Sequence, residues 1–141
     1  DTFNNRVSGQ SLTITGSGTV STALSGSGKT IILGTLSLAD GSGGLASNYS
    51  LSGGTFDVNS RQLNVSGSRV YDNTSTVNGS DLVVSTGVGV EVMTLSGQGS
   101  IANANVGDNK TVTQNTLSLV SASGSASNYS MGTISLNITN P

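Results

Sequence analysis

The chain has 141 residues, a formal net charge of −2, and only 9% charged residues, with five scattered basic residues that form no patch for nucleic acid or an anionic membrane. It contains neither histidine nor cysteine, which excludes disulfides, thiolate metal sites and catalytic triads that depend on histidine. Its polarity comes from Ser, Thr, Asn and 20 glycines, and no apolar window is long enough to cross a bilayer.

Apolar residues separated by one polar residue recur along the whole chain. Ser, Thr or Asn fills the positions between them, which predicts half-buried strands of antiparallel sheets. No stretch has a helical period, so we expect an all-β fold with a thin, aliphatic core. In chain order the expected strands contain Leu12/Ile14, Leu36/Leu38, Phe56/Val58, Leu63/Val65, Met93/Leu95, Leu117/Leu119 and Ile134/Leu136/Ile138.

The sequence also repeats itself. Residues 13–38 align with residues 94–119 at an offset of 81, and the offset becomes 80 before the pentapeptide ASNYS, which occurs at 46–50 and 126–130. Apolar positions stay apolar between the copies, as expected for a shared core. This predicts two tandem β-sandwich-like modules, 1–60 and 61–141, of which only the second is complete.

The first module lacks an N-terminal strand and turn of about 20 residues. Either the chain belongs to a longer array, or another chain supplies that strand, and the sequence leaves both alternatives open. We therefore expect 61–141 to fold alone and 1–60 not to do so.

Several turn residues occupy matching positions in the two copies. Gly34 and Asn115 interrupt the apolar alternation and predict a bulge or tight bend at positive φ. GSGK and GDNK, which end at Lys29 and Lys110, predict turns before a strand.

The tyrosines of ASNYS, Tyr49 and Tyr129, follow a loop of variable length and precede a strand. We interpret each as a core-capping ring whose hydroxyl bonds a neighbouring backbone group. A ligand-stacking role is the alternative.

One group of motifs, in order, resembles a known family. The segments are Tyr71-Asp72-Asn73-Thr74, Asn105-Val106-Gly107, Lys110-Thr111-Val112 and Asn128-Tyr129-Ser130. The first copy matches in part, with Lys29, Asn48 and Tyr49 among the counterparts, and it lacks the Tyr-Asp element. They resemble the tandem YDG-type repeat modules of large, secreted bacterial adhesins of the filamentous-haemagglutinin type, in which Gly usually stands at the position of Asn73. The resemblance implies an extracellular all-β repeat at the bacterial cell surface, with a role in adhesion or biofilm formation and with no catalytic or cofactor residues.

The residues themselves offer little catalytic chemistry. The seven carboxylates are spread along the chain rather than paired, unlike those of a glycosidase. GSGKT at 26–30 fails the phosphate-loop pattern because position 23 is Ala. We expect no enzymatic activity and no cofactor. Calcium remains an alternative, with oxygen ligands in residues 39–44 and 107–109.

The sequence therefore favours a structural stalk or extender segment of an extracellular adhesin or fibre. Its partners would be neighbouring modules of the same chain or of identical chains, with a host or matrix surface as a further partner, and without nucleic acid or membrane insertion. Two alternatives remain: a filament subunit that assembles by strand complementation, and a module that binds a glycan or surface.

Overall fold

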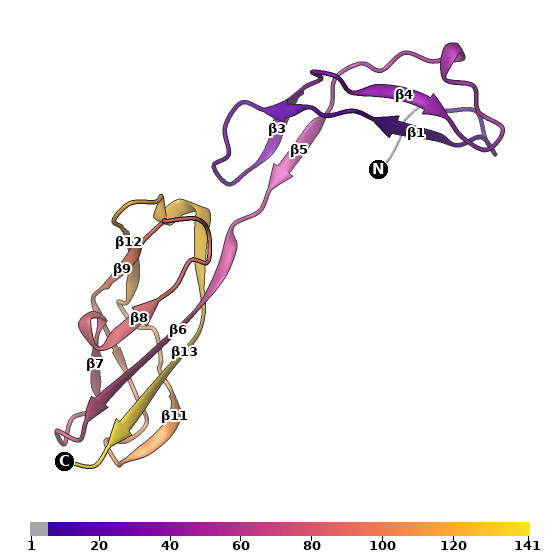
Figure 1. The fold of residues 1–141 in the computed structure, drawn as a ribbon. Helices are drawn as coiled ribbons and strands as arrows, with labels where there is room; N and C mark the ends of the chain where they lie inside the picture. Colours follow the sequence, from indigo (N-terminus) through magenta and orange to yellow (C-terminus); the bar gives the residue numbers. More distant parts are fainter. Residues whose placement is uncertain (1–5) are drawn as a thin grey trace. The chain divides into compact units, whose positions relative to one another are not determined.

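The computed structural model describes residues 6–141, and every regular element in that range is a strand or a single-turn 3-10 helix. The all-β prediction is confirmed. The chain forms two compact units, the first ending at Val58 and the second running from Asn59 to Pro141. Figure 1 shows both units.

The first unit contains two small sheets. Strands β1 and β4 form an antiparallel pair, and β2, β3 and β5 form a second sheet in that order. Leu12 is the buried hydrophobic residue of this unit's described part. The elements are β1 (Leu12–Thr15), β2 (Thr19–Val20), β3 (Gly26–Ile32), β4 (Ser37–Asp40), the 3-10 turn η1 (Ala46–Asn48) and β5 (Thr55–Val58).

The second unit is built around a four-stranded sheet in the order β11-β13-β6-β8. Two further antiparallel pairs, β10-β7 and β12-β9, complete it. The elements are β6 (Arg61–Val70), β7 (Thr76–Asn78), η2 (Gly79–Asp81), β8 (Leu82–Val84), β9 (Met93–Ser96), β10 (Gln98–Ser100), β11 (Gly107–Thr111), β12 (Ser118–Ser121), η3 (Ala126–Asn128) and β13 (Tyr129–Thr139).

One strand pair differs from the antiparallel prediction. The first and last strands of the second unit, β6 and β13, run parallel, from Arg61 opposite Tyr129 to Val70 opposite Thr139. A parallel pair needs a long crossover, and here the crossover is the whole chain between the two strands. Alternation in the sequence reports which face of a strand is buried, not the direction of its neighbour, so the antiparallel prediction was wrong for this pair.

The core of the second unit is aliphatic and continuous. Strand β13 contributes Ile134, Leu136 and Ile138, and the residues packed with them come from β6, β7, β8 and the loops after β10 and β11. A smaller cluster joins Leu63 and Met93 to the ring of Tyr129. Because Val65 and Leu136 are at most 1% exposed, removing either side chain leaves a cavity rather than a solvated surface.

The predicted bends at Gly34 and Asn115 are confirmed. Their φ angles are 55° and 46°, and each bend is closed by a 2.8 Å backbone bond, from Leu36 N–H to Leu33 O and from Leu117 N–H to Gln114 O. Only glycine and, at small cost, asparagine adopt this backbone readily.

The turns predicted at GSGK and GDNK are wrong, because both segments lie inside strands, β3 and β11. A bulge interrupts the ladder at each place. The bulged residues Gly28 and Asn109 have φ angles of 63° and 51°. The Gly28 N–H donates to the side chain of Asp57 on the neighbouring strand β5, and the Asn109 N–H donates to that of Asn137 on β13, both at 2.7 Å. Each strand therefore continues past its bulge.

Candidate functional site

The Tyr-Asp-Asn segment forms a tight turn directly after β6. The Asp72 carboxylate accepts the Thr74 N–H at 3.0 Å and the Thr74 hydroxyl at 2.9 Å. The Tyr71 hydroxyl donates to the Asn73 side chain at 3.0 Å, and Asn73 takes the left-handed conformation at φ 60°. Hydrogen bonds from the Thr74 backbone and hydroxyl, with the charge of Arg69, hold the pKa of Asp72 below its ordinary value.

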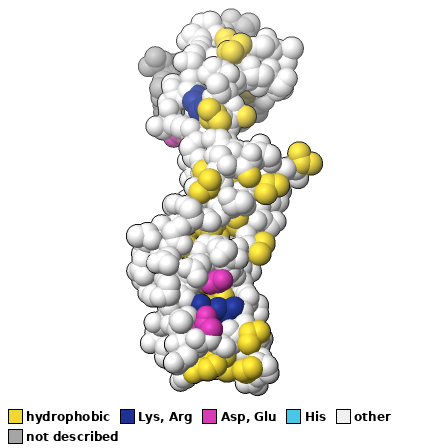
Figure 2. Space-filling view, turned by 90° about the vertical axis from the view of Figure 1, so that its left-hand side faces the viewer, with side chains coloured by type: hydrophobic (Ala, Val, Ile, Leu, Met, Phe, Trp, Pro, Cys, Tyr) yellow, Lys and Arg dark blue, Asp and Glu magenta, His cyan; other side chains and the backbone are white. Residues whose placement is uncertain are grey.

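Arg69 joins this turn to the sheet and was missed at the sequence level. Its guanidinium, whose side chain is 11% exposed, donates to the carbonyls of Thr76 at 2.5 Å and Thr74 at 2.6 Å. It also forms ion pairs with Asp72 at 3.4 Å and Asp81 at 3.6 Å. Figure 2 shows dark-blue atoms between magenta atoms on one face of the second unit.

A sequence signal for Arg69 did exist. Counting by two from the buried residues Leu63 and Val65 places Arg69 on the inward face of β6. A charged side chain at an inward position requires nearby acceptors, and carboxylates and carbonyls supply them to the two terminal nitrogens of Arg69.

Tyr129 opens β13, and its ring packs in the smaller core cluster. Its hydroxyl donates to a carboxylate oxygen of Glu91, where the sequence predicted a backbone partner. The hydrogen bond to Glu91, with burial, raises the pKa of Tyr129. The ring position is as expected, but the partner is a side chain from the loop before β9.

Tyr49 makes the matching contact in the first unit. Its hydroxyl donates to the Gln10 side chain at 2.6 Å and accepts the Val7 N–H at 3.2 Å. Gln10 and Glu91 are 81 residues apart, so both tyrosines bond equivalent positions. Tyr49 anchors the chain just before β1, and Tyr129 anchors the chain just before β9. Because both hydroxyl groups already form hydrogen bonds within the protein, we favour an anchoring role over ligand stacking.

Asn48 and Asn128 lie in the single-turn 3-10 helices that precede the tyrosines. Their N–H groups donate to Leu45 O at 3.1 Å and to Ser125 O at 3.0 Å. The preceding loop is also fixed, since Asp40 accepts the Ala46 N–H at 2.6 Å. These residues set the backbone path of the turn.

Lys29 and Lys110 each hold the loop that precedes their own strand. The Lys29 ammonium donates to the Thr22 carbonyl at 3.1 Å and to its hydroxyl at 2.8 Å. Lys110 donates to the Asn103 side chain at 2.9 Å and to the Asn105 carbonyl at 2.8 Å. In both units the lysine reaches the residue seven positions earlier, so the two loops are closed in the same way.

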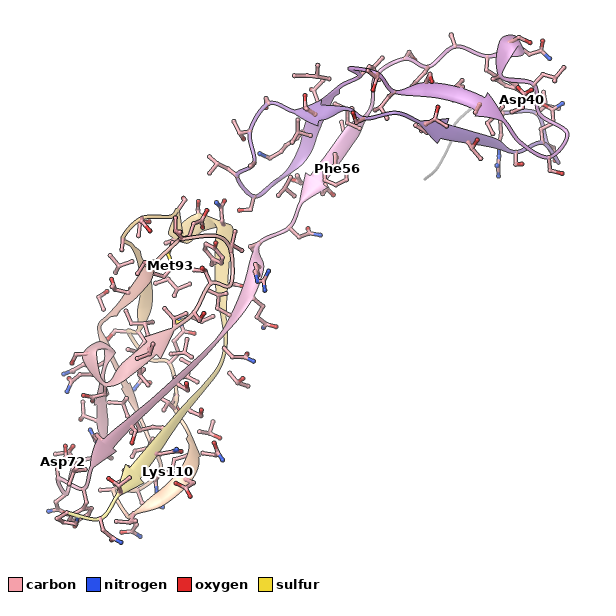
Figure 3. All side chains as sticks on the ribbon, in the orientation of Figure 1. Asp40, Phe56, Asp72, Met93 and Lys110 are labelled. Atoms are coloured by element: carbon pink, nitrogen blue, oxygen red, sulfur yellow. The ribbon has the colours of Figure 1, made fainter. Side chains whose placement is uncertain are left out.

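The predicted residues do not converge on one reaction centre. Asp72 and Lys110 lie at the end of the second unit where β6 and β13 finish, and Met93, beside Tyr129, lies at the other end (Figure 3). Within residues 6–141 no group of three His, Cys, Asp or Glu side chains is placed to hold a metal ion. The same range has no helix long and apolar enough to span a membrane. These contacts fix loops to strands at the two ends of the second unit.

Comparison with known proteins gives one match. Residues 58–136, more than half of the chain, match the family model of the YDG domain. No curated protein and no solved structure matches the chain.

Proposed function

Because the chain belongs to the YDG domain family, we propose that it is a load-bearing structural segment of an extracellular bacterial adhesin or fibre. Its role is to extend the parent protein from the cell surface and to hold its shape while a cell is attached. The proposal assigns the chain no catalytic step. The observation that carries it is the parallel pairing of the first and last strands of the second unit.

The direction of these two strands determines how the unit would resist a pull. Strand β6 begins at Arg61 and β13 ends at Thr139, and these ends lie at opposite ends of the pair (Figure 1). A pull on the two chain ends therefore slides β6 along β13. The interstrand hydrogen bonds lie across that direction and must break together, whereas bonds between strands pulled apart from one end break in succession.

In this proposal the two units are tandem copies of one module. Support comes from equivalent contacts at offsets of 80 and 81: the lysine bonds that close a loop, the tyrosine hydroxyl bonds, and the bulge bonds of Gly28 and Asn109. Low-complexity sequence would not keep one register of side-chain contacts. The first copy has no counterpart of residues 61–84 among its described residues.

Force spectroscopy on the full chain tests the proposal. The sequence has no cysteine, so handles can be attached through Asn59→Cys and Asn140→Cys, which leaves the first unit outside the path of the force. The matched control carries Asn59→Cys and Ser85→Cys. It pulls the antiparallel β6 and β8 apart from one end, because Val65 pairs with Val84.

We expect the first pair of handles to require a clearly higher force for the initial break, since unfolding under load is governed by the barrier in the pulled direction. Equal forces in the two directions would contradict a load-bearing role. For the extracellular location, antibodies against the chain should label intact source cells; labelling only after lysis would refute that part.

A further inference from the structure

The first unit carries an open apolar groove. Its volume is about 450 Å³, and it is lined by Gly18, Thr19, Val20, Ala23, Ile31, Leu36 and Phe56. Phe56 projects from β5 (Figure 3) and is 55% exposed, an unusual state for a large aromatic ring on a strand of a small sheet.

The equivalent positions of the second unit are closed. Ile101, Val112, Leu117 and Leu136 correspond to Val20, Ile31, Leu36 and Phe56, and they are 5%, 5%, 2% and 0% exposed. The residues that cover them include Val65, Val77 and Leu82. All three belong to residues 61–84, the segment without a counterpart in the described part of the first unit.

The backbone around the groove is also unpartnered. In the second unit β13 pairs with β11 on one edge and with β6 on the other, and β10 pairs with β7. Their counterparts β5 and β2 pair only with β3 among the described residues. The groove therefore combines exposed apolar side chains with two strand edges whose N–H and C=O groups can receive a partner.

We propose that this groove is a docking site for a strand–turn–strand peptide segment of the same chemistry as residues 61–84. The inference rests on the repeat relationship under the proposed function. The strand equivalent to β6 runs parallel to β5, with Phe56 opposite the equivalent of Gly67 and Val58 opposite that of Arg69, as Leu136 and Ile138 are in the second unit.

Side chains equivalent to Val65 and Val77 fill the groove over Ile31 and Leu36. The strand equivalent to β7 adds to β2, as β7 does to β10. A small apolar ligand would fill the volume equally well. It would leave both strand edges unpaired, so the edges favour a peptide segment.

The test adds a copy of residues 61–81 ahead of Asp1 in the full chain, because Leu82 and Asp1 are equivalent at the offset of 81. Amide hydrogen exchange of β5 is measured in the unmodified chain and in the fusion. We expect exchange at Thr55–Val58 to slow by about tenfold or more in the fusion, as edge amides become paired. Exchange in β13 should not change.

The matched control is the same fusion with V65N and V77N in the added copy only. It keeps the length and all other residues but replaces the two apolar side chains that fill the groove by polar amides, and we expect exchange at β5 to return to that of the unmodified chain. Protection that is absent from the first fusion, or equal in both fusions, would overturn the proposal. The force measurement depends on β6 and β13 of the second unit, so the two proposals fail separately.

Discussion

Leu136 and Phe56 occupy equivalent positions, one in a closed core and one in an open groove, so replacing each by alanine should lower stability by different amounts. Leu136 is 0% exposed and lies within the main core cluster, whereas Phe56 is 55% exposed. Replacing a buried leucine by alanine lowers the free energy of unfolding by about 2–5 kcal/mol. Because Leu136 is fully enclosed, we expect a loss of about 3 kcal/mol or more from the second unit.

The cost at Phe56 should be much smaller. Full burial of a large apolar side chain contributes about 1.5–3 kcal/mol, and less than half of Phe56 is buried, so Phe56→Ala should cost the first unit about 1 kcal/mol or less. For a domain of this size, about 1 kcal/mol corresponds to a shift of about 4–8 °C in Tm. The Leu136→Ala variant should therefore melt about 12 °C or more below the parent chain.

The assay is thermal unfolding of the full chain, with amide hydrogen exchange to assign each transition to a unit. If Leu136→Ala prevents folding, Ile138→Val provides a milder change, with an expected cost of about 1 kcal/mol. A loss of stability from Phe56→Ala as large as that from Leu136→Ala would show that the groove is closed, and would refute the reasoning.

Three further predictions concern the boundary and the two perturbed side chains. Fragment 61–141 should unfold in one cooperative transition and fragment 1–60 in none; a cooperative melt of 1–60 would contradict the boundary. The folded state lowers the pKa of Asp72, so its stabilisation is complete above about pH 4 and is lost as pH falls through the lower folded value. The Asp72→Asn variant should have a flatter acid limb in urea unfolding, and identical limbs would exclude this role. The folded state raises the pKa of Tyr129, so its stabilisation is present below about pH 10 and is lost as pH rises through the higher folded value. Tyr129→Phe, which keeps the ring, should be less stable at neutral pH and lack this alkaline loss; an unchanged alkaline limb would count against the bond to Glu91.

Much of the fold was accessible from the sequence because alternation directly encodes burial. Each predicted apolar pair overlaps a strand in the structure, and Leu136 and Ile138 point inward as the pattern requires. Turn chemistry was also readable at Gly34 and Asn115, where only residues tolerant of positive φ would serve. The turn predicted at GSGK was wrong, because the N–H of Gly28 donates to the side chain of Asp57, 29 residues away, and no local pattern contains that partner.

The remaining features depend on contacts that no local pattern contains. The parallel pairing of β6 and β13 joins the first and the last strand of the second unit, which lie far apart in the sequence. The partner of Tyr129 is Glu91, 38 residues earlier, and Arg69 resembles any exposed charge until its inward register is counted. Which strands pair over such distances depends on which apolar faces must be buried together. It is therefore determined by the assembled sheet rather than by any short stretch of sequence.

Comparison of the two units shows which features depend on local sequence and which depend on the segment that covers the core. Lys29 and Lys110 both bond the side chain seven positions earlier, although one core is open and the other closed. These loop closures therefore do not require a covering segment such as residues 61–84, and the motif ASNYS identifies only the 3-10 turn and the tyrosine that follows it. The Tyr71-Asp72 turn, by contrast, closes the end of β6 through Arg69. It belongs to the segment that buries Leu136 and Ile138. Under the tandem arrangement that we propose, complete modules should therefore be counted by the Tyr-Asp turn and its preceding strand, because within residues 6–141 that segment encloses the core of the second unit.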